Sequence, residues 1–321
     1  MKRVFFCISL YVSVACFGVD ITIPPGATAV WLANELKRAD VIQNAYFFRL
    51  YMHQNRVTNR IHQGTFSIEK NTPYADIIDI VTGKKQQLIR VTIPEGFTLN
   101  EIATRLHATG VISDPEEFLD FIHNKNAQVI SDQLATESIA SHEGLFFADT
   151  YYFQKNMPFS QVYTSLTNPI IEQLVPEYTR YDAPPLSFYD TLILASIIEK
   201  EAGTPSEMPL ISGVFHNRLR KNMPLGSCPT VGYALGEPRK KQLLYTDLTV
   251  ESPYNTYKYA GLPPTPIAAP SKTAFLAALS PAETPYLYFV AKNDGSGTHF
   301  FSKTLTEHLT NQQNTLLTQT Q

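Results

Sequence analysis

The segment SFYDTLILASIIEKEAG, residues 187 to 203, predicts a single helix that is almost entirely apolar until its last turn. Ser187 followed three residues later by Asp190 is typical of a helix start, and Gly203 is typical of a helix end. The run between them contains enough aliphatic side chains to cross the core of a domain. We therefore expect this helix to be central to the fold and to carry charged groups only at its C-terminal end.

Two glutamates near the end of this helix point in different directions. Because successive helical residues turn by about 100°, Leu194, Ile197 and Ile198 share one side of the helix and Glu201 continues it, whereas Glu199 points about 160° away from Glu201. Desolvation raises the pKa of a carboxyl group, which is the property a general acid needs near neutral pH. Glu201 is the better candidate acid, although a position so near the helix end is equally consistent with a carboxylate in water.

Composition limits the classes of protein that fit. The 321 residues are 44% hydrophobic and 17% charged, which is typical of a globular protein with room for two domains. A net charge of −3 without a basic stripe argues against a nucleic-acid partner and favours a neutral or weakly charged substrate. Because the sequence contains no glycine-rich phosphate loop, no G-x-S-x-G and no H-E-x-x-H, we expect neither a cofactor nor a metal site.

Residues 1 to 20 predict an export signal or a short membrane anchor. Lys2 and Arg3 precede an uncharged apolar run from Val4 to Val19, which falls just short of the about 17 to 25 residues needed to span a bilayer. Cleavage and retention of this segment both stay open. Two of the three cysteines lie inside it, so Cys228 is alone in the exported part and no intrachain disulfide is expected there.

A repeat is visible in the first third of the chain. The stretch ITIPPGATAVWLANELKRADVI begins at Ile21, and VTIPEGFTLNEIATRLHATGVI begins at Val91; the two align without a gap. Each predicts a short strand, a Pro-x-Gly turn and an amphipathic helix. Because an irregular stretch from about 124 to 141 follows, we expect one N-terminal region over residues 21–137 and one catalytic domain over residues 138–321.

A series of further motifs follows the 187–203 helix in a fixed order. They are VFHNRL from Val214, CPTVGY from Cys228, YNTY from Tyr254, GLPP from Gly261, YLYFV from Tyr286 and HFF from His299, with EGLFFADTYYF from Glu143 placed earlier in the chain. Together with ASIIEKE from Ala195, this succession closely resembles the MltG/YceG-like family of endolytic murein transglycosylases. The resemblance covers nearly the whole chain.

The resemblance implies a fold and a reaction. It implies repeated N-terminal strand-turn-helix units, of which the second, at about 91–137, is LysM-like, followed by a catalytic domain. The residues themselves predict antiparallel strands such as 286–290 and 298–302, joined through the turn at 293–295, and we expect an α+β fold. The second glutamate of E-K-E, Glu201, is the catalytic acid and base of the family. The implied reaction cleaves the β-1,4 bond between N-acetylmuramic acid and N-acetylglucosamine without water and leaves a 1,6-anhydro end.

The same resemblance assigns roles to further side chains. The residues expected to bind substrate are Asn217, Thr230, Tyr233, Tyr254, Asn255 and Tyr257, because aromatic rings pack on sugars and amides bind hydroxyl groups. Those expected to support the site are Glu199, Glu143, Asp149 and His299. For several of them, Asn217 and Asp149 included, a purely structural role is an open alternative.

Two departures from the family pattern leave the function open in part. Cys228 replaces an aspartate, and Ala148 replaces a proline. We therefore weigh three possibilities: a transglycosylase, a peptidoglycan-binding or assembly factor without turnover, and a muramidase-like hydrolase. The expected location is the bacterial inner membrane with the catalytic domain in the periplasm, or a soluble periplasmic protein after cleavage. Expected partners are glycan strands of peptidoglycan and the synthases that make them.

Overall fold

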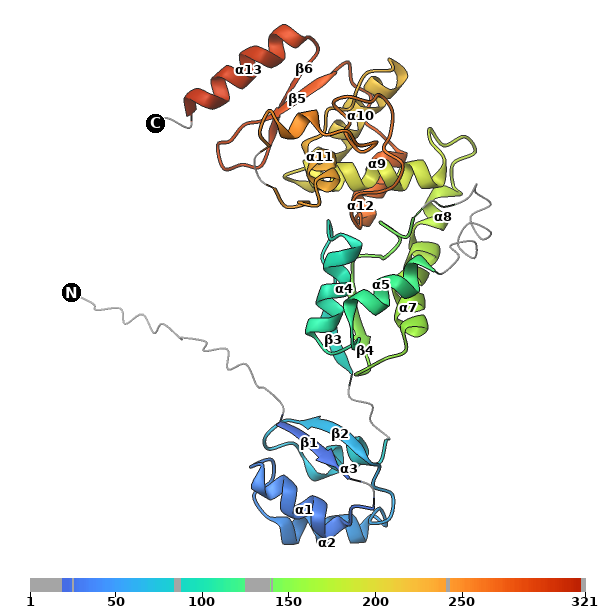
Figure 1. Cartoon of the computed structure of the whole chain (residues 1–321), viewed down its shortest axis with the longest axis vertical. Coiled ribbons are helices and arrows are strands. Elements are labelled where there is room, and N and C mark those ends of the chain that lie inside the picture. The colour runs from blue at the N-terminus through green and yellow to red at the C-terminus, as the bar shows by residue number, and fades with distance from the viewer. Residues whose placement is uncertain are drawn as a thin grey trace, which may run out of the picture. The chain divides into compact units, whose positions relative to one another are not determined.

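The computed structural model describes residues 19–24, 26–83, 88–124, 139, 141–240 and 243–318, and it divides into two compact units (Figure 1). The units are Met1–Leu88 and Ile89–Gln321. Most of the predicted signal or anchor lies outside the described residues, but Val19 and Asp20 belong to a strand. Within the described part of the chain, no helix is long and apolar enough to cross a membrane.

The first unit is a two-stranded sheet packed with three helices. Its strands are β1 (Val19–Ile23) and β2 (Gly64–Ile68), and its helices are α1 (Ala29–Arg38), α2 (Ala45–Gln54) and α3 (Tyr74–Val81). The strands are antiparallel, and the side chains of Ile21, Leu32 and Phe48 are buried between sheet and helices. Thr28 caps α1 by accepting a hydrogen bond from the Trp31 amide, as the strand-turn-helix pattern requires.

The second copy of the pattern opens the second unit. Strand β3 (Ile89–Thr92) leads to α4 (Leu99–Ala108) and α5 (Pro115–His123), and Thr98 with Glu101 forms a reciprocal capping box on α4. Both copies therefore form the predicted strand, turn and helix. The LysM-like character of the second copy stays a prediction.

The boundary between units lies earlier than the one expected at residues 137 and 138. Strand β3 pairs antiparallel with β4 (Thr150–Phe153), which comes from the region assigned to the catalytic domain. Buried side chains of α4 also share one continuous core with helices much later in the chain. A strand needs a partner and an amphipathic helix needs a core, and the second copy finds both beyond residue 138.

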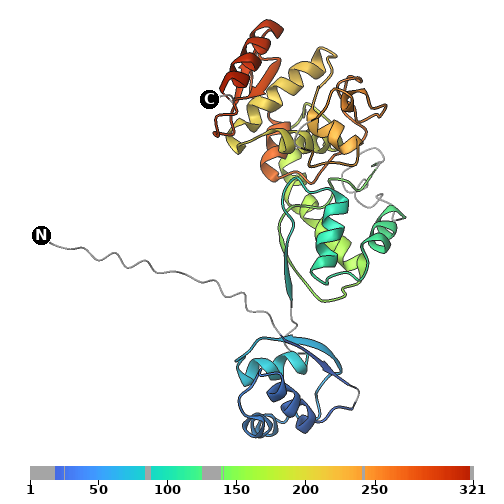
Figure 2. The same ribbon diagram turned by 60° about the vertical axis from the view of Figure 1, so that its left-hand side comes forward.

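The remaining elements form the larger part of the second unit. They are α7 (Phe159–Gln173), α8 (Val175–Tyr178), α9 (Phe188–Glu201), α10 (Met208–Arg220), α11 (Cys228–Ala234), α12 (Lys272–Leu279), β5 (Tyr288–Ala291), β6 (His299–Ser302) and α13 (Leu305–Thr318), with single turns at η1 (Pro205–Glu207) and η2 (Asp247–Thr249). The strands β5 and β6 are antiparallel and lie beside α13 (Figure 1, Figure 2). Mixed helices and small antiparallel sheets confirm the α+β class.

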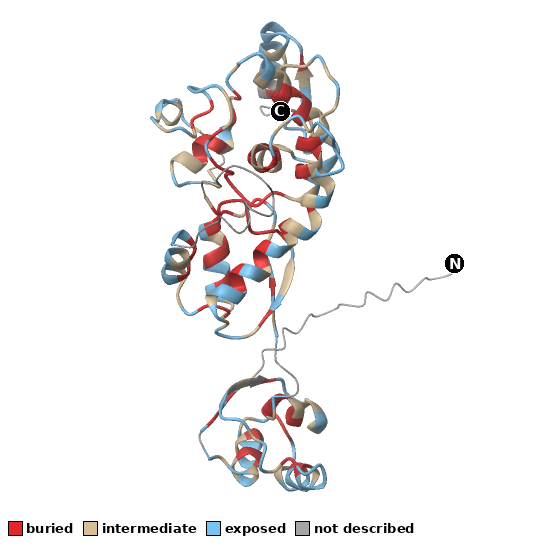
Figure 3. Ribbon diagram, turned by 90° about the vertical axis from the view of Figure 1, so that its right-hand side faces the viewer, coloured by how far each residue is buried: buried red, intermediate tan, exposed pale blue. Residues whose placement is uncertain are grey.

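Helix α9 is the predicted 187–203 helix, and it is the most buried one in the second unit. Ser187 accepts a hydrogen bond from the Asp190 amide at 3.0 Å, so the predicted start is confirmed. Nearly every side chain from Phe188 to Ile198 is buried, and α10, α11 and α12 pack against the helix. Figure 3 colours the buried parts of the chain red. Each fully buried aliphatic side chain contributes about 1.5 to 3 kcal/mol relative to exposure, which fixes α9 in place.

The backbone at the C-terminal end of α9 contacts the backbone of the loop between β5 and β6. A Cβ atom added to Gly203 would lie 2.1 Å from the carbonyl oxygen of Gly297. Only a residue without a side chain allows this approach. The contact brings the chain just after Glu201 beside the turn that precedes His299, although the two are distant in sequence.

Replacement of Gly203 with alanine should separate these two segments. We expect Gly203→Ala to lower the free energy of unfolding by about 1 to 3 kcal/mol, as overpacking does, measured by urea denaturation of the full chain. Ser206→Ala, at an exposed nearby position, is the control and should change little. Equal stability of Gly203→Ala and the control would mean that the contact is not a constraint.

Candidate active site

A cleft of about 500 Å³ opens at the C-terminal end of α9. Its walls come from the loop before α11, from β5, from the start of β6 and from one side of α13. Six residues that bear on its chemistry are Glu201, Arg218, Cys228, Tyr257, Tyr288 and His299. The cleft thus collects side chains from seven segments that are separated in sequence.

Glu201 carries the one carboxylate among the described residues that line this cleft. Its Oε1 atom accepts a hydrogen bond from the Ser227 hydroxyl at 2.6 Å. Burial raises the pKa of Glu201, while the Ser227 hydrogen bond and the positive charge of the nearby Arg218 act in the opposite direction. A carboxyl group with a raised pKa can hold a proton that it later donates.

His299 is held at the cleft by Glu207. The Nδ1 atom of His299 lies 2.9 Å from Oε2 of Glu207, and the His299 backbone amide donates to Oε1 of the same carboxylate at 3.0 Å. The Phe289 ring packs against the imidazole edge-to-face, with ring centroids 5.5 Å apart. Both the orientation and the position of the imidazole are therefore fixed.

Arg218 places a positive charge at the cleft and braces its wall at the same time. Its Nε atom donates to the Leu287 carbonyl at 2.7 Å, and its Nη1 atom donates to the Leu225 carbonyl at 2.6 Å. The guanidinium also lies 5.2 Å from the centre of the Tyr288 ring. Arg218 thereby ties α10 to β5 and to the loop that carries Ser227.

Tyr257 is the one predicted substrate-binding residue that lines the cleft. The residue is 38% exposed, and its hydroxyl lies 3.0 Å from the Cys228 thiol. Cys228, which replaces the family's aspartate, is thus in contact with a candidate sugar-binding aromatic ring. An exposed ring at the cleft suits packing against a pyranose face.

Three other residues expected to bind substrate brace loops instead, and they do not line the cleft. Asn217 donates two hydrogen bonds of 2.8 Å to backbone carbonyls ahead of β5. Asn255 is fully buried and donates to two backbone carbonyls at 3.0 and 2.9 Å, while Thr230 is fully buried and donates to the Ser227 carbonyl at 2.8 Å. Their polar groups are used inside the protein, because irregular backbone needs buried partners.

Two of the carboxylates expected to support the site also have structural positions. Glu199 accepts a hydrogen bond from the Ser271 amide at 3.0 Å and so anchors the start of α12 to α9. Asp149 is exposed and accepts from the Thr150 amide at 2.6 Å at the start of β4. The helical count therefore separated Glu199 from Glu201 correctly.

A second cavity, of about 800 Å³, is lined by two further predicted residues, Glu143 and Tyr233. Glu143 lies in its wall and accepts hydrogen bonds from the Leu99 amide at 2.9 Å and from the Tyr233 hydroxyl at 3.2 Å. The Tyr254 ring packs against Tyr233, with centroids 4.9 Å apart. Burial raises the pKa of Glu143 to about 7. These residues join the start of α4 to α11.

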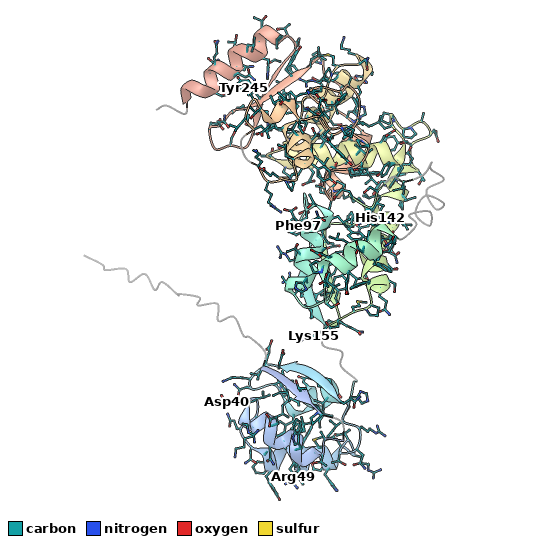
Figure 4. The ribbon with its side chains drawn as sticks, viewed as in Figure 1. Asp40, Arg49, Phe97, His142, Lys155 and Tyr245 are labelled. Carbon is teal, nitrogen blue, oxygen red and sulfur yellow. The ribbon has the colours of Figure 1, made fainter. Side chains whose placement is uncertain are left out.

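The edge of this second cavity is built on an aromatic and ionic contact. Arg239 lies 4.8 Å from the centre of the Phe97 ring, labelled in Figure 4, and it also binds the Glu101 carboxylate. The Phe97 carbonyl accepts a hydrogen bond from the Ala269 amide at 2.8 Å. The residues just before α4 are thus part of the framework that surrounds α9.

Sequence reasoning missed Ser227, Arg218 and Glu207. Each acts through a contact with a residue far away in the chain, so no local periodicity distinguishes it. Arg218 was visible within the VFHNRL motif, where a charged side chain interrupts a mostly apolar helix. For Ser227 and Glu207 the sequence contained no such signal.

Comparison with known proteins decides the family. The model of the YceG-like family matches residues 21–314. The chain belongs to the YceG-like family. The resemblance found in the motifs is therefore confirmed over almost the full length.

Relatives of the chain share a name. A protein of Bacillus subtilis strain 168 named endolytic murein transglycosylase is 34% identical over 90% of this chain and 82% of its own length. A protein of the same name from Streptococcus pneumoniae D39 is 27% identical, and the match covers 85% of this chain and 54% of that longer protein. The crystal structure of a YceG-like protein from Listeria monocytogenes superposes with a TM-score of 0.58 at 33% identity and covers 92% of this chain and 99% of its own.

The raised pKa of Glu143 predicts a dependence of stability on pH. A carboxyl group whose pKa rises from 4.5 to about 7 on folding stabilises the protein below about pH 4.5, and this contribution is lost as pH rises through 7. We expect the stability difference between wild type and Glu143→Gln to fall by on the order of 3 kcal/mol from about pH 4 to about pH 8.5.

Urea unfolding at each pH measures this difference. The matched control is Glu283→Gln, which changes an exposed carboxylate and should shift wild-type stability equally at both pH values. A stability difference for Glu143→Gln that does not vary with pH would show that Glu143 titrates normally.

Proposed function

We propose that this protein is an endolytic murein transglycosylase whose single acid and base is Glu201. Membership of the YceG-like family and the shared name of the relatives support the class of enzyme. The observation that carries the assignment is the cleft at the end of α9, where Glu201 is the sole carboxylate among the described lining residues. Retaining and inverting glycosidases use two carboxylates, whereas a transglycosylase needs one.

The proposed substrate is the β-1,4 bond between N-acetylmuramic acid and N-acetylglucosamine within a glycan strand. Protonated Glu201 gives its proton to the glycosidic oxygen, and the bond from that oxygen to the muramic anomeric carbon breaks. The ionised carboxylate then accepts the proton of the muramic 6-hydroxyl, whose oxygen bonds to the anomeric carbon. The products are a free 4-hydroxyl and a 1,6-anhydro end, and no water is consumed.

The geometry around Glu201 suits both halves of this cycle. Burial favours the protonated form that starts the reaction, and the Ser227 hydrogen bond stabilises the carboxylate that follows. Because these two influences act in opposite directions, the same carboxyl group can give up a proton and take one back. Tyr257 offers an exposed ring at the same cleft for a neighbouring sugar.

We further propose the location and partners that suit this substrate. The uncharged run at 4–19 after two basic residues favours attachment to the bacterial inner membrane, with both folded units in the periplasm. Nascent glycan strands are available there, together with the synthases that extend them. An enzyme that cuts within a strand would set the length of the strands.

Product analysis tests the proposal. The full chain is incubated with uncrosslinked glycan strands, and new ends are identified by mass spectrometry. We expect 1,6-anhydro ends from wild type and from Glu199→Gln, and a loss of rate of about 10² to 10⁴ in Glu201→Gln, as removal of a general acid and base causes.

Other outcomes would contradict the proposal in distinct ways. Reducing ends would identify a muramidase-like hydrolase in which water replaces the 6-hydroxyl. Strands that are bound but left uncut by every version would identify a binding or assembly factor. If Glu201→Gln produced anhydro ends at the wild-type rate, the catalytic acid would have to be another residue.

A further inference from the structure

Glu207 and His299 form a nearly buried pair at the wall of the cleft. The side chain of His299 is 8% exposed and that of Glu207 is 14% exposed. Both carboxylate oxygens of Glu207 are used on one residue, because one faces Nδ1 of the imidazole and the other faces the backbone amide. Two hydrogen bonds accepted by a single carboxylate hold His299 more firmly than one, because the bond from the backbone amide fixes the position of the residue and the bond from Nδ1 fixes the rotation of its ring.

The carboxylate also decides which ring nitrogen carries hydrogen. An ionised carboxylate can only accept hydrogen bonds, so the Nδ1 atom facing it must be the donor. In a neutral imidazole the other nitrogen, Nε2, is then an acceptor with a free lone pair. Because His299 lines the same cleft as Glu201, that acceptor is available to a molecule bound there.

We infer that Glu207 is a positioning residue for the reaction: it holds His299 so that Nε2 accepts a hydrogen bond from a hydroxyl of the sugar bound beside Glu201. This inference rests on the proposed function. A hydroxyl held in this way is oriented at the reacting bond, which lowers the entropy cost of bringing the reacting groups together. Neither motif reasoning nor the comparisons assign any role to Glu207.

The surrounding structure fixes the position of Glu207 and His299 relative to Glu201. Glu207 ends η1, which begins shortly after Gly203, and His299 begins β6 shortly after Gly297. The close backbone contact between these two glycines therefore joins the segments that carry the pair. Phe289 and Phe301 pack against the imidazole, with centroids 5.5 and 6.3 Å from it, and oppose its rotation.

Glu207→Gln is the sharpest variant because it keeps the shape of the side chain. An amide can turn its NH₂ group toward Nδ1, which makes Nδ1 an acceptor and moves the ring hydrogen to Nε2. Nε2 then can no longer accept a hydrogen bond from the substrate. If the role of Glu207 were purely structural, Glu207→Gln would change the stability of the protein without changing which ring nitrogen of His299 carries hydrogen.

The first measurement is NMR of the full chain labelled with ¹⁵N in histidine, with His299 assigned by the signal that is lost in His299→Gln. At about pH 8 we expect hydrogen on Nδ1 and not on Nε2 in wild type, and a substantial Nε2–H fraction in Glu207→Gln. Glu283→Gln, at an exposed position, is the control and should match wild type.

The second measurement is the rate on uncrosslinked glycan strands. We expect Glu207→Gln to lower kcat by about tenfold or more with a much smaller change in KM, because the lost interaction orients the reacting group. The double variant Glu207→Gln with His299→Gln should be only slightly less active than His299→Gln alone, because the two substitutions remove the same interaction.

Three results would overturn the inference. The first is hydrogen on Nε2 of His299 in wild type, the second is an unchanged tautomer in Glu207→Gln, and the third is full activity of Glu207→Gln. If wild type leaves every glycan uncut, the proposed function fails, and the ring nitrogens still report whether Glu207 fixes His299.

Discussion

The burial of one helix, and the single carboxylate at its end, organise this protein. Almost every side chain of helix α9 from Phe188 to Ile198 is buried in the core, and the C-terminal end of the same helix places Glu201 at the cleft. Apolar burial fixes the helix, so the carboxylate is fixed with it, and its partial removal from water raises its pKa. The stability of the core and the chemistry of the site therefore depend on the same packing.

The rest of the site is held in place by polar side chains that donate hydrogen bonds to the backbone of the protein. Asn217, Asn255 and Arg218 each donate to two or more backbone carbonyls outside the long helices and the strands. Buried carbonyls without partners are costly, so these side chains make an irregular cleft wall possible. The same logic places Glu207 behind His299, and it explains why motif residues need not touch substrate.

The sequence predicted what depends on local periodicity and missed what depends on distant contacts. The extent of α9, its cap at Ser187 and the separation of Glu201 from Glu199 follow from a 100° turn per residue, and they are confirmed. The contacts of Ser227 with Glu201 and of Glu207 with His299 span 26 and 92 residues, and no local pattern encodes them. The early boundary at Leu88 was missed for the same reason, because β3 finds its partner in β4. Asn217 and Asn255 were predicted to bind substrate because an amide that binds a sugar and one that binds the backbone look identical in sequence.

Burial keeps Glu201 protonated above the normal pH range of a glutamate, so that it can act as an acid. The most direct measurement is a ¹³C NMR titration of the Glu201 carboxyl carbon in the full chain, with the signal assigned by its loss in Glu201→Gln. We expect a titration midpoint above the ordinary value of 4.5, coincident with the pH at which glycan cleavage declines. A midpoint at or below 4.5 would contradict it, because the carboxylate would then have no proton to give.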